Sequence, residues 1–245
     1  YYSLSLTSVT IPDSVTCISK RTFSCCYNLM SIALPSGLTA IEPGTFELCN
    51  SLTSIAIPDS ITTIAEDAFV SCKALQSFTL SPNHPYFFLA DGALCRTVDN
   101  TLLFYPNARE NRTYRIPDGI AAISAYAFYD CDLLESVVIP DSITQIPERA
   151  FYGCSALASV SLPDSLTEIG IAAFSFCAAL TDIRLPASIT EISAGLFSGC
   201  SSLATLEIPD SVTIIGGDAF VGCSSLTSMT IPDSVTEIGA NPFPR

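Results

Sequence analysis

Cysteines recur in this chain at a spacing that suggests disulfide or metal chemistry. The chain of 245 residues contains 11 cysteines. Eight of them form a column that advances by 23 residues within each block of the sequence: Cys26, Cys49, Cys72, Cys131, Cys154, Cys177, Cys200 and Cys223. Equivalent side chains in stacked coils point in parallel and not at one another, so we expect a buried row of thiols without disulfide bonds. No C-x-x-C pair suggests a zinc site.

Aspartates also recur once per repeat, directly after a proline in most copies. The row consists of Asp13, Asp59, Asp118, Asp141, Asp164, Asp210 and Asp233. A calcium ion requires about six to eight oxygens around one point, and a single carboxylate per coil supplies far fewer. We expect these side chains to bond to nearby backbone in turns. The sequence therefore predicts neither a metal nor a cofactor.

Catalysis would have to be built around a very small set of residues. The chain has one histidine, His84, so a Ser-His-Asp arrangement could use only that residue. Cys95 is the nearest conceivable nucleophile, but no sequence signature around it supports a dyad. No glycine-rich phosphate-binding motif occurs either. The sequence therefore predicts that this protein is not an enzyme.

The charge and composition exclude several classes of partner. Ten basic against 24 acidic residues give a formal net charge of -14 at pH 7, which repels phosphate backbones and anionic lipid headgroups. We therefore expect no nucleic acid partner. No run of 18 apolar residues occurs, so we also expect no membrane insertion in this segment. At 49% hydrophobic residues, the chain has enough apolar side chains for a continuous core.

The elements that must position these residues repeat with a period of 23. An Ile-Pro or Leu-Pro pair begins at positions 11, 34, 57, 116, 139, 162, 185, 208 and 231. A phenylalanine follows each pair twelve residues later, at positions 23, 46, 69, 128, 151, 174, 197, 220 and 243. Three columns, Ile/Leu-Pro, Phe and Cys, thus agree on one register. Such self-similarity is typical of a repeat solenoid.

One repeat, from Leu52 to Ala74, shows the elements that each coil should contain. Alternation at residues 52–57 predicts a short strand, which Pro58 ends because it cannot donate to a ladder. Asp59 and Ser60 complete a turn, and residues 61–64 form a second extended piece. The segment at residues 66–69 is long enough for only a single helical turn.

The theme IPDSVTIIGGDAFVGCSSL, from Ile208 to Leu226, resembles the BspA-type leucine-rich repeat family. The resemblance covers essentially the whole chain in nine near-copies. It implies a right-handed repeat solenoid of the α/β-type leucine-rich repeat class, with short parallel strands on its concave face. It also implies adhesion or protein binding, at a cell surface or in secreted form, since the family occurs largely in surface-exposed proteins of host-associated bacteria and some protists.

One segment interrupts the array. Leu80 and Ile116 are 36 positions apart instead of 23, so we divide the chain into regular coils at 1–80, an irregular coil at 81–115 and regular coils at 116–245. Two alternating apolar stretches on either side of Asp99-Asn100 predict a β-hairpin in the irregular coil. We expect one continuous solenoid that is a piece of a longer protein.

Two surfaces are candidates for binding a protein ligand of unknown identity. The irregular coil gathers Arg96, Arg109 and Arg112 among six Phe and Tyr residues, and Arg and Tyr are enriched at interface hot spots. The other surface is the outward side of the predicted sheet in the second half, which we expect to include Glu135, Ser136, Val138, Ser159, Ser161, Asp182, Arg184, Thr205 and Glu207. The sheet lacks exposed Trp or Tyr, so stacking on sugar rings is not indicated.

Each surface also has a purely structural interpretation. The aromatic residues of the irregular coil could fill the core where the Phe column is missing, while its arginines only solvate the hairpin. Asp182 and Arg184 could form an exposed ion pair of little energetic weight. Two functions remain open: a protein-binding module of the adhesin type, and a structural spacer that presents another domain. A local cluster that departs from the repeat average favours binding.

Overall fold

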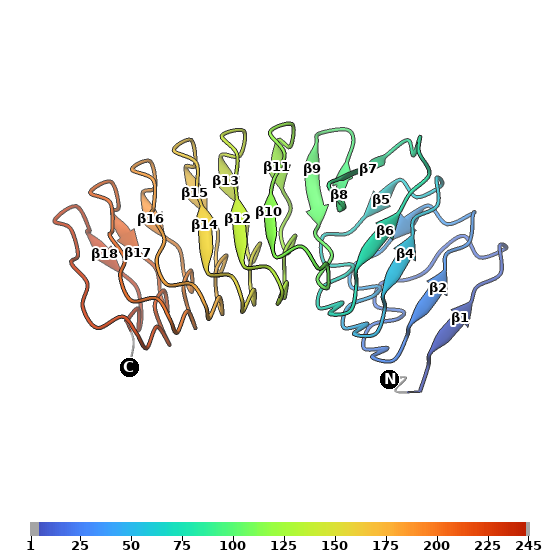
Figure 1. Cartoon of the computed structure of the whole chain (residues 1–245), viewed down its shortest axis with the longest axis horizontal. Helices are drawn as coiled ribbons and strands as arrows, with labels where there is room; N and C mark the ends of the chain where they lie inside the picture. The colour runs from blue at the N-terminus through green and yellow to red at the C-terminus, as the bar shows by residue number, and fades with distance from the viewer. Residues whose placement is uncertain (1–4, 244–245) are drawn as a thin grey trace. The chain divides into compact units, whose positions relative to one another are not determined.

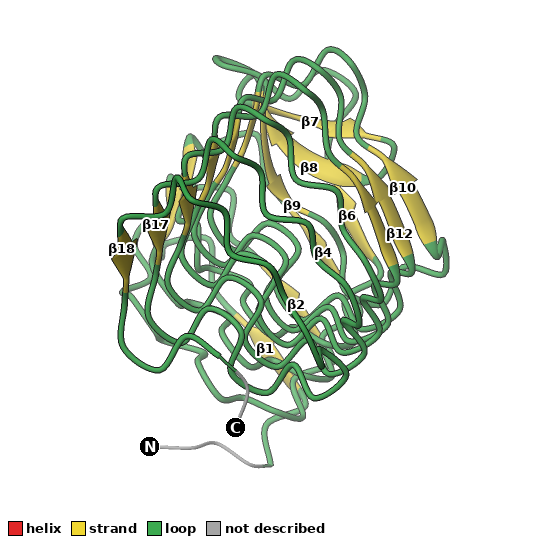
Figure 2. Ribbon diagram, turned by 90° about the vertical axis from the view of Figure 1, so that its left-hand side faces the viewer, coloured by secondary structure: helices red, strands yellow, loops and turns green. Residues whose placement is uncertain are grey.

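Stacked coils of short strands and turns form the whole structure. This computed structural model describes residues 5–243, and it divides into two compact units, Tyr1–Glu110 (unit 1) and Asn111–Arg245 (unit 2). Within each unit, successive 23-residue coils lie side by side with their strands parallel (Figure 1). Residues 5–243 contain strands, turns and loops but no helix (Figure 2). These residues accordingly include no helix that is long and apolar enough to cross a membrane.

Unit 1 has two kinds of strand in its regular coils. The three-residue strands are β1 (Ser8–Thr10), β2 (Ser31–Ala33), β4 (Ser54–Ala56) and β6 (Ser77–Thr79). The two-residue strands are β3 (Ala40–Ile41) and β5 (Thr63–Ile64). The strands pair in parallel with a shift of one repeat, as where Ile55 of β4 lies opposite Phe78 of β6. Each strand therefore extends the same hydrophobic face from one coil to the next.

Unit 2 repeats this arrangement over more coils. Its three-residue strands are β10 (Thr113–Arg115), β12 (Ser136–Val138) and β14 (Ser159–Ser161), which form one parallel sheet. Its two-residue strands are β11 (Ala122–Ile123), β13 (Gln145–Ile146), β15 (Glu168–Ile169), β16 (Glu191–Ile192), β17 (Ile214–Ile215) and β18 (Glu237–Ile238). The sheet of β16, β17 and β18 continues through the last coils.

A turn follows the Ile/Leu-Pro pair, as predicted. The segment before each Cys, in contrast, does not form the single helical turn that was predicted. In the first, the Ile61 amide donates to the Pro58 carbonyl at 3.0 Å. In the second, consecutive single turns replace the helix, as where the Cys72 amide donates to Phe69 at 3.2 Å. The position two residues after each Phe up to Phe220 has a positive φ, for example 58° at Ser71. In seven of these coils the position two residues before the Phe, inside the predicted segment, also has a positive φ, for example 53° at Arg149, and a left-handed residue cannot continue a right-handed helix.

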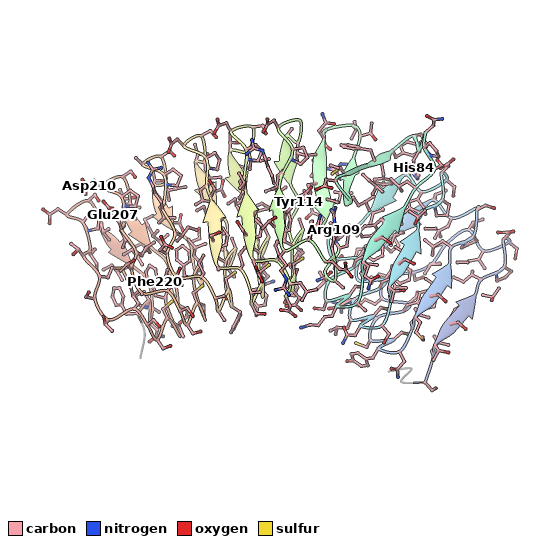
Figure 3. The ribbon with its side chains drawn as sticks, viewed as in Figure 1. His84, Arg109, Tyr114, Glu207, Asp210 and Phe220 are labelled. Carbon is pink, nitrogen blue, oxygen red and sulfur yellow. The ribbon has the colours of Figure 1, made fainter. Side chains whose placement is uncertain are left out.

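The Phe column forms a stack of parallel rings in the core of each unit. In unit 2, ring centroids are 4.7 Å apart between Phe128 and Phe151, and 6.1 Å apart between Phe174 and Phe197, with interplanar angles of 15° and 8°. Unit 1 has the same contact between Phe23 and Phe46. Each such pair stabilises the fold by about 0.5–1.5 kcal/mol beyond the area that it buries. Figure 3 shows Phe220 among the side chains inside the coils of unit 2.

The Cys column forms a ladder of thiols that donate to backbone carbonyls. The Cys177 thiol donates to the Phe151 carbonyl at 3.2 Å, and the Cys154 amide donates to the same oxygen at 3.3 Å. The same thiol contact occurs at Cys49, Cys72, Cys154, Cys200 and Cys223. The column thiols are buried and, as predicted, no cysteine of the described chain forms a disulfide. A thiol therefore supplies the second donor to a carbonyl oxygen that has two lone pairs.

The irregular coil contains the predicted hairpin and one further strand. Strands β8 (Ala93–Arg96) and β9 (Thr101–Phe104) pair antiparallel on either side of Asp99-Asn100, which confirms the hairpin. The sequence prediction missed β7 (Phe87–Ala90), which pairs antiparallel with β8 through Asp91 and Gly92. Both turn residues have positive φ, 45° and 81°, as a two-residue hairpin of type I′ requires. This Asp-Gly pair was the available signal.

Aromatic side chains of the irregular coil fill the core where the Phe column is missing. The ring of Phe104 in β9 contacts Phe69 edge-to-face, with centroids 5.2 Å apart, and also contacts Phe78 at 6.2 Å. Phe87 and Tyr105 are buried as well. The structural interpretation therefore holds for Phe87, Phe104 and Tyr105, whereas Tyr86 is exposed and Phe88 is only partly buried. In a regular coil, a Phe ring stacks on the ring of the neighbouring coil. Here Phe104, from β9, takes that place and contacts Phe69 edge-to-face.

Candidate protein-binding surface

The outward positions of β12 and β14 form a narrow polar strip. Ser136 lies opposite Ser159 and Val138 lies opposite Ser161 in the parallel register. The Ser159 hydroxyl donates to the Ser136 hydroxyl at 3.0 Å, and the two β14 serines are exposed. The inward residues of β10 and β12, such as Tyr114 in β10, are buried in unit 2 (Figure 3). The structure thus brings four of the predicted sheet residues together.

Glu135 joins this strip to a predicted arginine of the irregular coil. The Arg112 guanidinium forms an ion pair with the Glu135 carboxylate, and both side chains are about half exposed. The Glu135 amide also donates to the Arg112 carbonyl at 2.6 Å. Backbone and side chain therefore link the two residues. Arg112 belongs to the same surface as the predicted sheet residues and not to a separate basic patch.

The remaining predicted sheet residues line a groove on the surface of unit 2. Asp182 and Arg184 come from one coil and Thr205 and Glu207 from the next, and all four are exposed. We call the hollow between these coils the charged groove, and its lining also includes Asp210. Figure 3 shows Glu207 and Asp210 close together on the surface of unit 2. The groove therefore contains three carboxylates and one guanidinium.

The segments that line the charged groove are extended but do not form the predicted strands. Ile183 and Leu206 are buried between exposed neighbours, so the alternation of inward and outward side chains is retained. The Ala204 amide donates to the Thr181 carbonyl at 3.1 Å and keeps these coils in register. This bond alone does not close a ladder, which needs successive paired bonds. The prediction of sheet strands at these two positions is therefore wrong.

Arg184 does not pair with Asp182, the partner that the sequence suggested. Its guanidinium lies 3.3 Å from the Asp164 carboxylate of the preceding coil, and both side chains are more than 80% exposed. The Asp182 carboxylate instead accepts a hydrogen bond from the Thr181 hydroxyl at 3.2 Å. An ion pair this exposed contributes little to stability. Arg184 therefore remains available to a partner at small cost.

The other two predicted arginines lie in unit 1 and each is held by a carboxylate of the irregular coil. Two guanidinium nitrogens of Arg96 donate to the Asp99 carboxylate, which lowers the pKa of that carboxyl to about 2. The Arg109 guanidinium lies 2.9 Å from Asp91 and 5.7 Å from the centre of the Tyr105 ring. Only 19% of its side chain is exposed. These contacts give both arginines a structural role in the hairpin (Figure 3 for Arg109).

The two groups considered for a catalytic dyad are both engaged with backbone. The Nδ1 atom of His84 accepts from the amides of Tyr86 and Phe87, and its Nε2 lies 3.0 Å from the Pro58 carbonyl. The Cys95 thiol donates to the Ala93 carbonyl at 3.6 Å, and burial raises the pKa of this thiol to about 12. Within residues 5–243, no cluster of three or more His, Cys, Asp or Glu residues could hold a metal ion.

An aromatic cluster that was not predicted from the sequence lies on the turns of unit 2. Tyr126, Tyr129, Tyr152 and Phe176 contact one another in series across three coils, and we call them the aromatic turn cluster. Two of them occupy columns that hold glycine in other coils, since Tyr126 corresponds to Gly195 and Phe176 to Gly199. A comparison of the coils column by column would have found them.

The comparisons with known proteins agree with the repeat architecture. The BspA type leucine rich repeat region, in six copies, matches residues 1–89 and 121–245. A leucine rich cell surface protein from Faecalibacterium prausnitzii A2-165 is 35% identical, with a TM-score of 0.84 over 97% of this chain. This chain spans 60% of that protein. No curated protein sequence matches the chain.

Two further solved structures share the fold at lower identity. A leucine-rich repeat protein from Eubacterium ventriosum is 23% identical over 96% of this chain and 75% of its own, with a TM-score of 0.80. The pneumococcal vaccine antigen PcpA is 17% identical over 95% of this chain and 74% of its own, with a TM-score of 0.64. The repeat columns, the stacked coils and the family match lead to one conclusion: the chain belongs to the BspA-type leucine-rich repeat family.

Proposed function

We propose that this chain is a non-catalytic module that binds a protein ligand through the charged groove. One observation carries the proposal: Asp182, Arg184 and Glu207 are exposed and line a single hollow of unit 2. The corresponding strand positions in unit 1 hold small neutral residues, Ser, Ala and Thr. A surface that departs locally from its repeat average is what a binding role requires, because the fold itself makes no use of these charges.

Charge gives the groove its selectivity. Three carboxylates and the Arg184 guanidinium favour a partner with complementary charges, and such complementarity raises association rates and rejects wrong partners. The polar strip at Ser136, Val138, Ser159 and Ser161, with the Arg112–Glu135 pair, extends the proposed binding surface within unit 2. No cofactor is needed for this mode of recognition.

We further propose that the protein is displayed at a cell surface or secreted. The support is the similarity to the 35% identical Faecalibacterium protein, which is a leucine rich cell surface protein. The leucine-rich repeat fold is typically non-catalytic, which agrees with the engagement of His84 and Cys95 by backbone groups. A surface location would give the charged groove access to proteins outside the cell.

A structural spacer is the second candidate, and unit 1 favours it. The outward positions of β2, β4 and β6 are exposed Ser, Ala and Thr residues with little to distinguish one coil from another. A spacer needs only such uniform coils. Under this alternative, the charges of unit 2 would keep the chain soluble and would bind nothing.

The test is a capture experiment with a matched control. The intact chain is immobilised and exposed to a pool of extracellular matrix and serum proteins, and the captured proteins are quantified by mass spectrometry. The groove variant carries Asp182→Ala, Arg184→Ala and Glu207→Ala. The control variant carries Ser31→Ala, Ser54→Ala and Ser77→Ala, which change exposed strand positions of unit 1.

Binding through the groove predicts a protein that the native chain and the control capture equally. The groove variant should capture on the order of tenfold less of it, because loss of a hot-spot residue costs about 2 kcal/mol or more. Equal capture by all three chains would place the binding outside the charged groove and contradict this proposal, and no capture by any of them would favour the spacer. Circular dichroism of the groove variant checks that its coils remain folded.

A further inference from the structure

The aromatic turn cluster departs from the other coils of unit 2. Tyr129 and Tyr152 occupy one column, and the following coils hold Ser175, Ser198 and Val221 there. The column of Phe176 continues with Gly199 and Gly222. Large aromatic side chains are thus confined to three neighbouring coils. The repeat pattern does not require them, because the next two coils fold in the same way with small residues.

The four rings form a continuous series along the turns. Ring centroids are 5.8 Å apart between Tyr126 and Tyr129, 4.8 Å between Tyr129 and Tyr152, and 5.2 Å between Tyr152 and Phe176. Tyr129 and Tyr152 are stacked with an interplanar angle of 10°, and Phe176 meets Tyr152 edge-on. The series crosses the coils in the direction in which they stack.

The cluster is accessible and held in place by its neighbours. Phe176 is 49% exposed, and the three tyrosines are partly exposed. A Cβ atom on Gly199 would lie 2.6 Å from Cδ1 of Phe176, so this ring rests directly on the glycine backbone. The Tyr126 hydroxyl lies 3.3 Å from the Arg149 guanidinium, which can donate to it. A rigid, exposed aromatic surface loses little entropy when a partner binds.

The backbone at the cluster has the left-handed conformation that these turn positions adopt throughout the array. Tyr126, Arg149 and Phe176 have φ values of 61°, 53° and 60°. Glycine adopts this region at no steric cost and occupies it at Gly195, Gly199 and Gly222. The conformation belongs to the turn, and the cluster differs from the following coils in carrying large aromatic side chains on it.

The ring geometry and the nearby charges indicate the chemistry of the partner. Tyr129 and Tyr152 stack face to face and Phe176 meets Tyr152 edge-on, so the series presents ring edges and hydroxyls. Burial and the nearby Asp130 carboxylate raise the pKa of Tyr129 to about 12, and Glu148 forms an ion pair of 3.1 Å with Arg149, whose guanidinium contacts Tyr126. The surface therefore combines exposed apolar area with an excess of negative charge.

We propose that the aromatic turn cluster is a second binding surface, distinct from the charged groove, for a polypeptide segment that carries Lys or Arg beside apolar residues. The apolar side chains of the segment pack on Phe176 and the ring edges of Tyr152. Its cations lie beside the carboxylates at Asp130 and Glu148. Aromatic and arginine residues dominate the energetics of such interfaces, which matches the composition of this cluster.

The experiment uses a display library of random 12-residue peptides, selected on the intact chain. A synthetic peptide with the enriched sequence is then titrated by fluorescence polarisation. The cluster variant carries Tyr152→Ser and Phe176→Gly, which are the residues that the next coils use at these positions. The control variant carries Leu48→Gly, which relieves the same left-handed strain at φ 62° in the equivalent column of unit 1.

The proposal predicts that enriched peptides combine Lys or Arg with apolar residues. The cluster variant should bind the peptide at least about tenfold more weakly than native, while its melting temperature stays equal or rises. The Leu48→Gly control should bind normally. Acidic consensus peptides, no enriched peptide, or unchanged binding by the cluster variant would overturn the proposal.

Two further arms distinguish the aromatic turn cluster from the charged groove and from a carbohydrate site. The variant with Asp182, Arg184 and Glu207 changed to Ala should keep full peptide affinity. Peptide binding to the aromatic turn cluster can therefore be tested even if the charged groove binds no protein. Cellohexaose and maltohexaose serve as sugar probes. Binding of either sugar that is lost in the cluster variant would show a carbohydrate site in place of a peptide site.

Discussion

At the scale of single residues, the cysteine column gives buried backbone carbonyls a second hydrogen bond. Six Phe carbonyls accept from the amide three residues later, and the thiol of the next coil adds a second bond to the same oxygen. A small side chain with a weak donor suits this position because it must fit between stacked coils. These six thiols donate to carbonyl oxygens, which accounts for a row of cysteines without disulfide bonds.

Thiol alkylation tests this arrangement directly. Cys17 is exposed and Cys25 is partly exposed, while the other nine cysteines are buried. Iodoacetamide at pH 8, without reductant, should therefore add at most two adducts to the native chain and eleven to the chain unfolded in guanidinium, because no disulfide protects any thiol. Intact-mass spectrometry counts the adducts. Fewer than eleven adducts after unfolding would reveal disulfides and contradict the ladder.

The same thiols predict how stability depends on pH. Burial raises the pKa of Cys49 to about 12 from an ordinary value of 9.0, and raises those of Cys72 and Cys177 well above it. The native chain then binds more protons than the unfolded chain above pH 9, so the contribution of the thiols to stability is constant below this value and falls as pH rises beyond it. Thermal melting between pH 7 and pH 11 should show the decline beginning near pH 9.

A single substitution provides the control for this pH dependence. Cys177→Ser keeps a donor to the Phe151 carbonyl but removes a group that titrates in this range. Its decline in melting temperature above pH 9 should be shallower than that of the native chain. Identical slopes would mean that Cys177 ionisation makes no contribution to alkaline unfolding.

At the scale of elements, the repeat pattern determined most of what the structure shows. The 23-residue spacing predicted the parallel stacking, the Ile/Leu-Pro turns and the columns at Phe128 and Cys131, because each follows from burial and chain geometry within one coil. Left-handed residues such as Phe176 were not predicted, since nothing in their own local sequence marks an aromatic residue for that conformation, and only the glycines of the same column in other coils, such as Gly199, signal it. Ion-pair partners were also beyond prediction, because they depend on side-chain reach between coils, as in Arg184 with Asp164.

The stacked rings make a quantitative prediction about neighbouring coils. Phe174 is fully buried with rings on both sides, at 5.3 Å from Phe151 and 6.1 Å from Phe197. Phe174→Ala should therefore lower the free energy of unfolding by about 3–5 kcal/mol, as the loss of a buried aromatic ring usually does. Urea denaturation measures the change.

A matched substitution near the end of the same stack tests whether ring neighbours matter. Phe220 is equally buried and stacks on Phe197 at 5.9 Å, with Phe243 beyond it being 38% exposed. Phe220→Ala should cost less than Phe174→Ala, because coils in a solenoid are stabilised through nearest-neighbour interfaces. A larger cost for Phe220 would contradict this description of the core.

At the scale of the whole molecule, net charge is the dominant property. A formal charge of -14 is spread over coils most of which contribute more acidic than basic side chains. Like charges at this density keep a protein soluble and oppose its compact state. The acidic excess also favours partners with basic residues, which is consistent with both surfaces proposed for unit 2. Added salt should therefore raise the stability of the chain and weaken its binding to basic partners.

Salt dependence is the measurable consequence. Sodium chloride at 150 mM shortens the screening length from about 30 Å at 10 mM to about 8 Å, which weakens repulsion between exposed carboxylates. The melting temperature should rise, by about 2–4 °C for each kcal/mol of repulsion relieved in a chain of this size. Binding of a Lys- or Arg-bearing peptide should weaken over the same range. A variant with Glu66→Gln, Glu191→Gln and Glu237→Gln changes three exposed carboxylates that belong to neither proposed surface. Its melting temperature should respond less to salt than that of the native chain, and an equal response would mean that screening of carboxylate repulsion is not the cause.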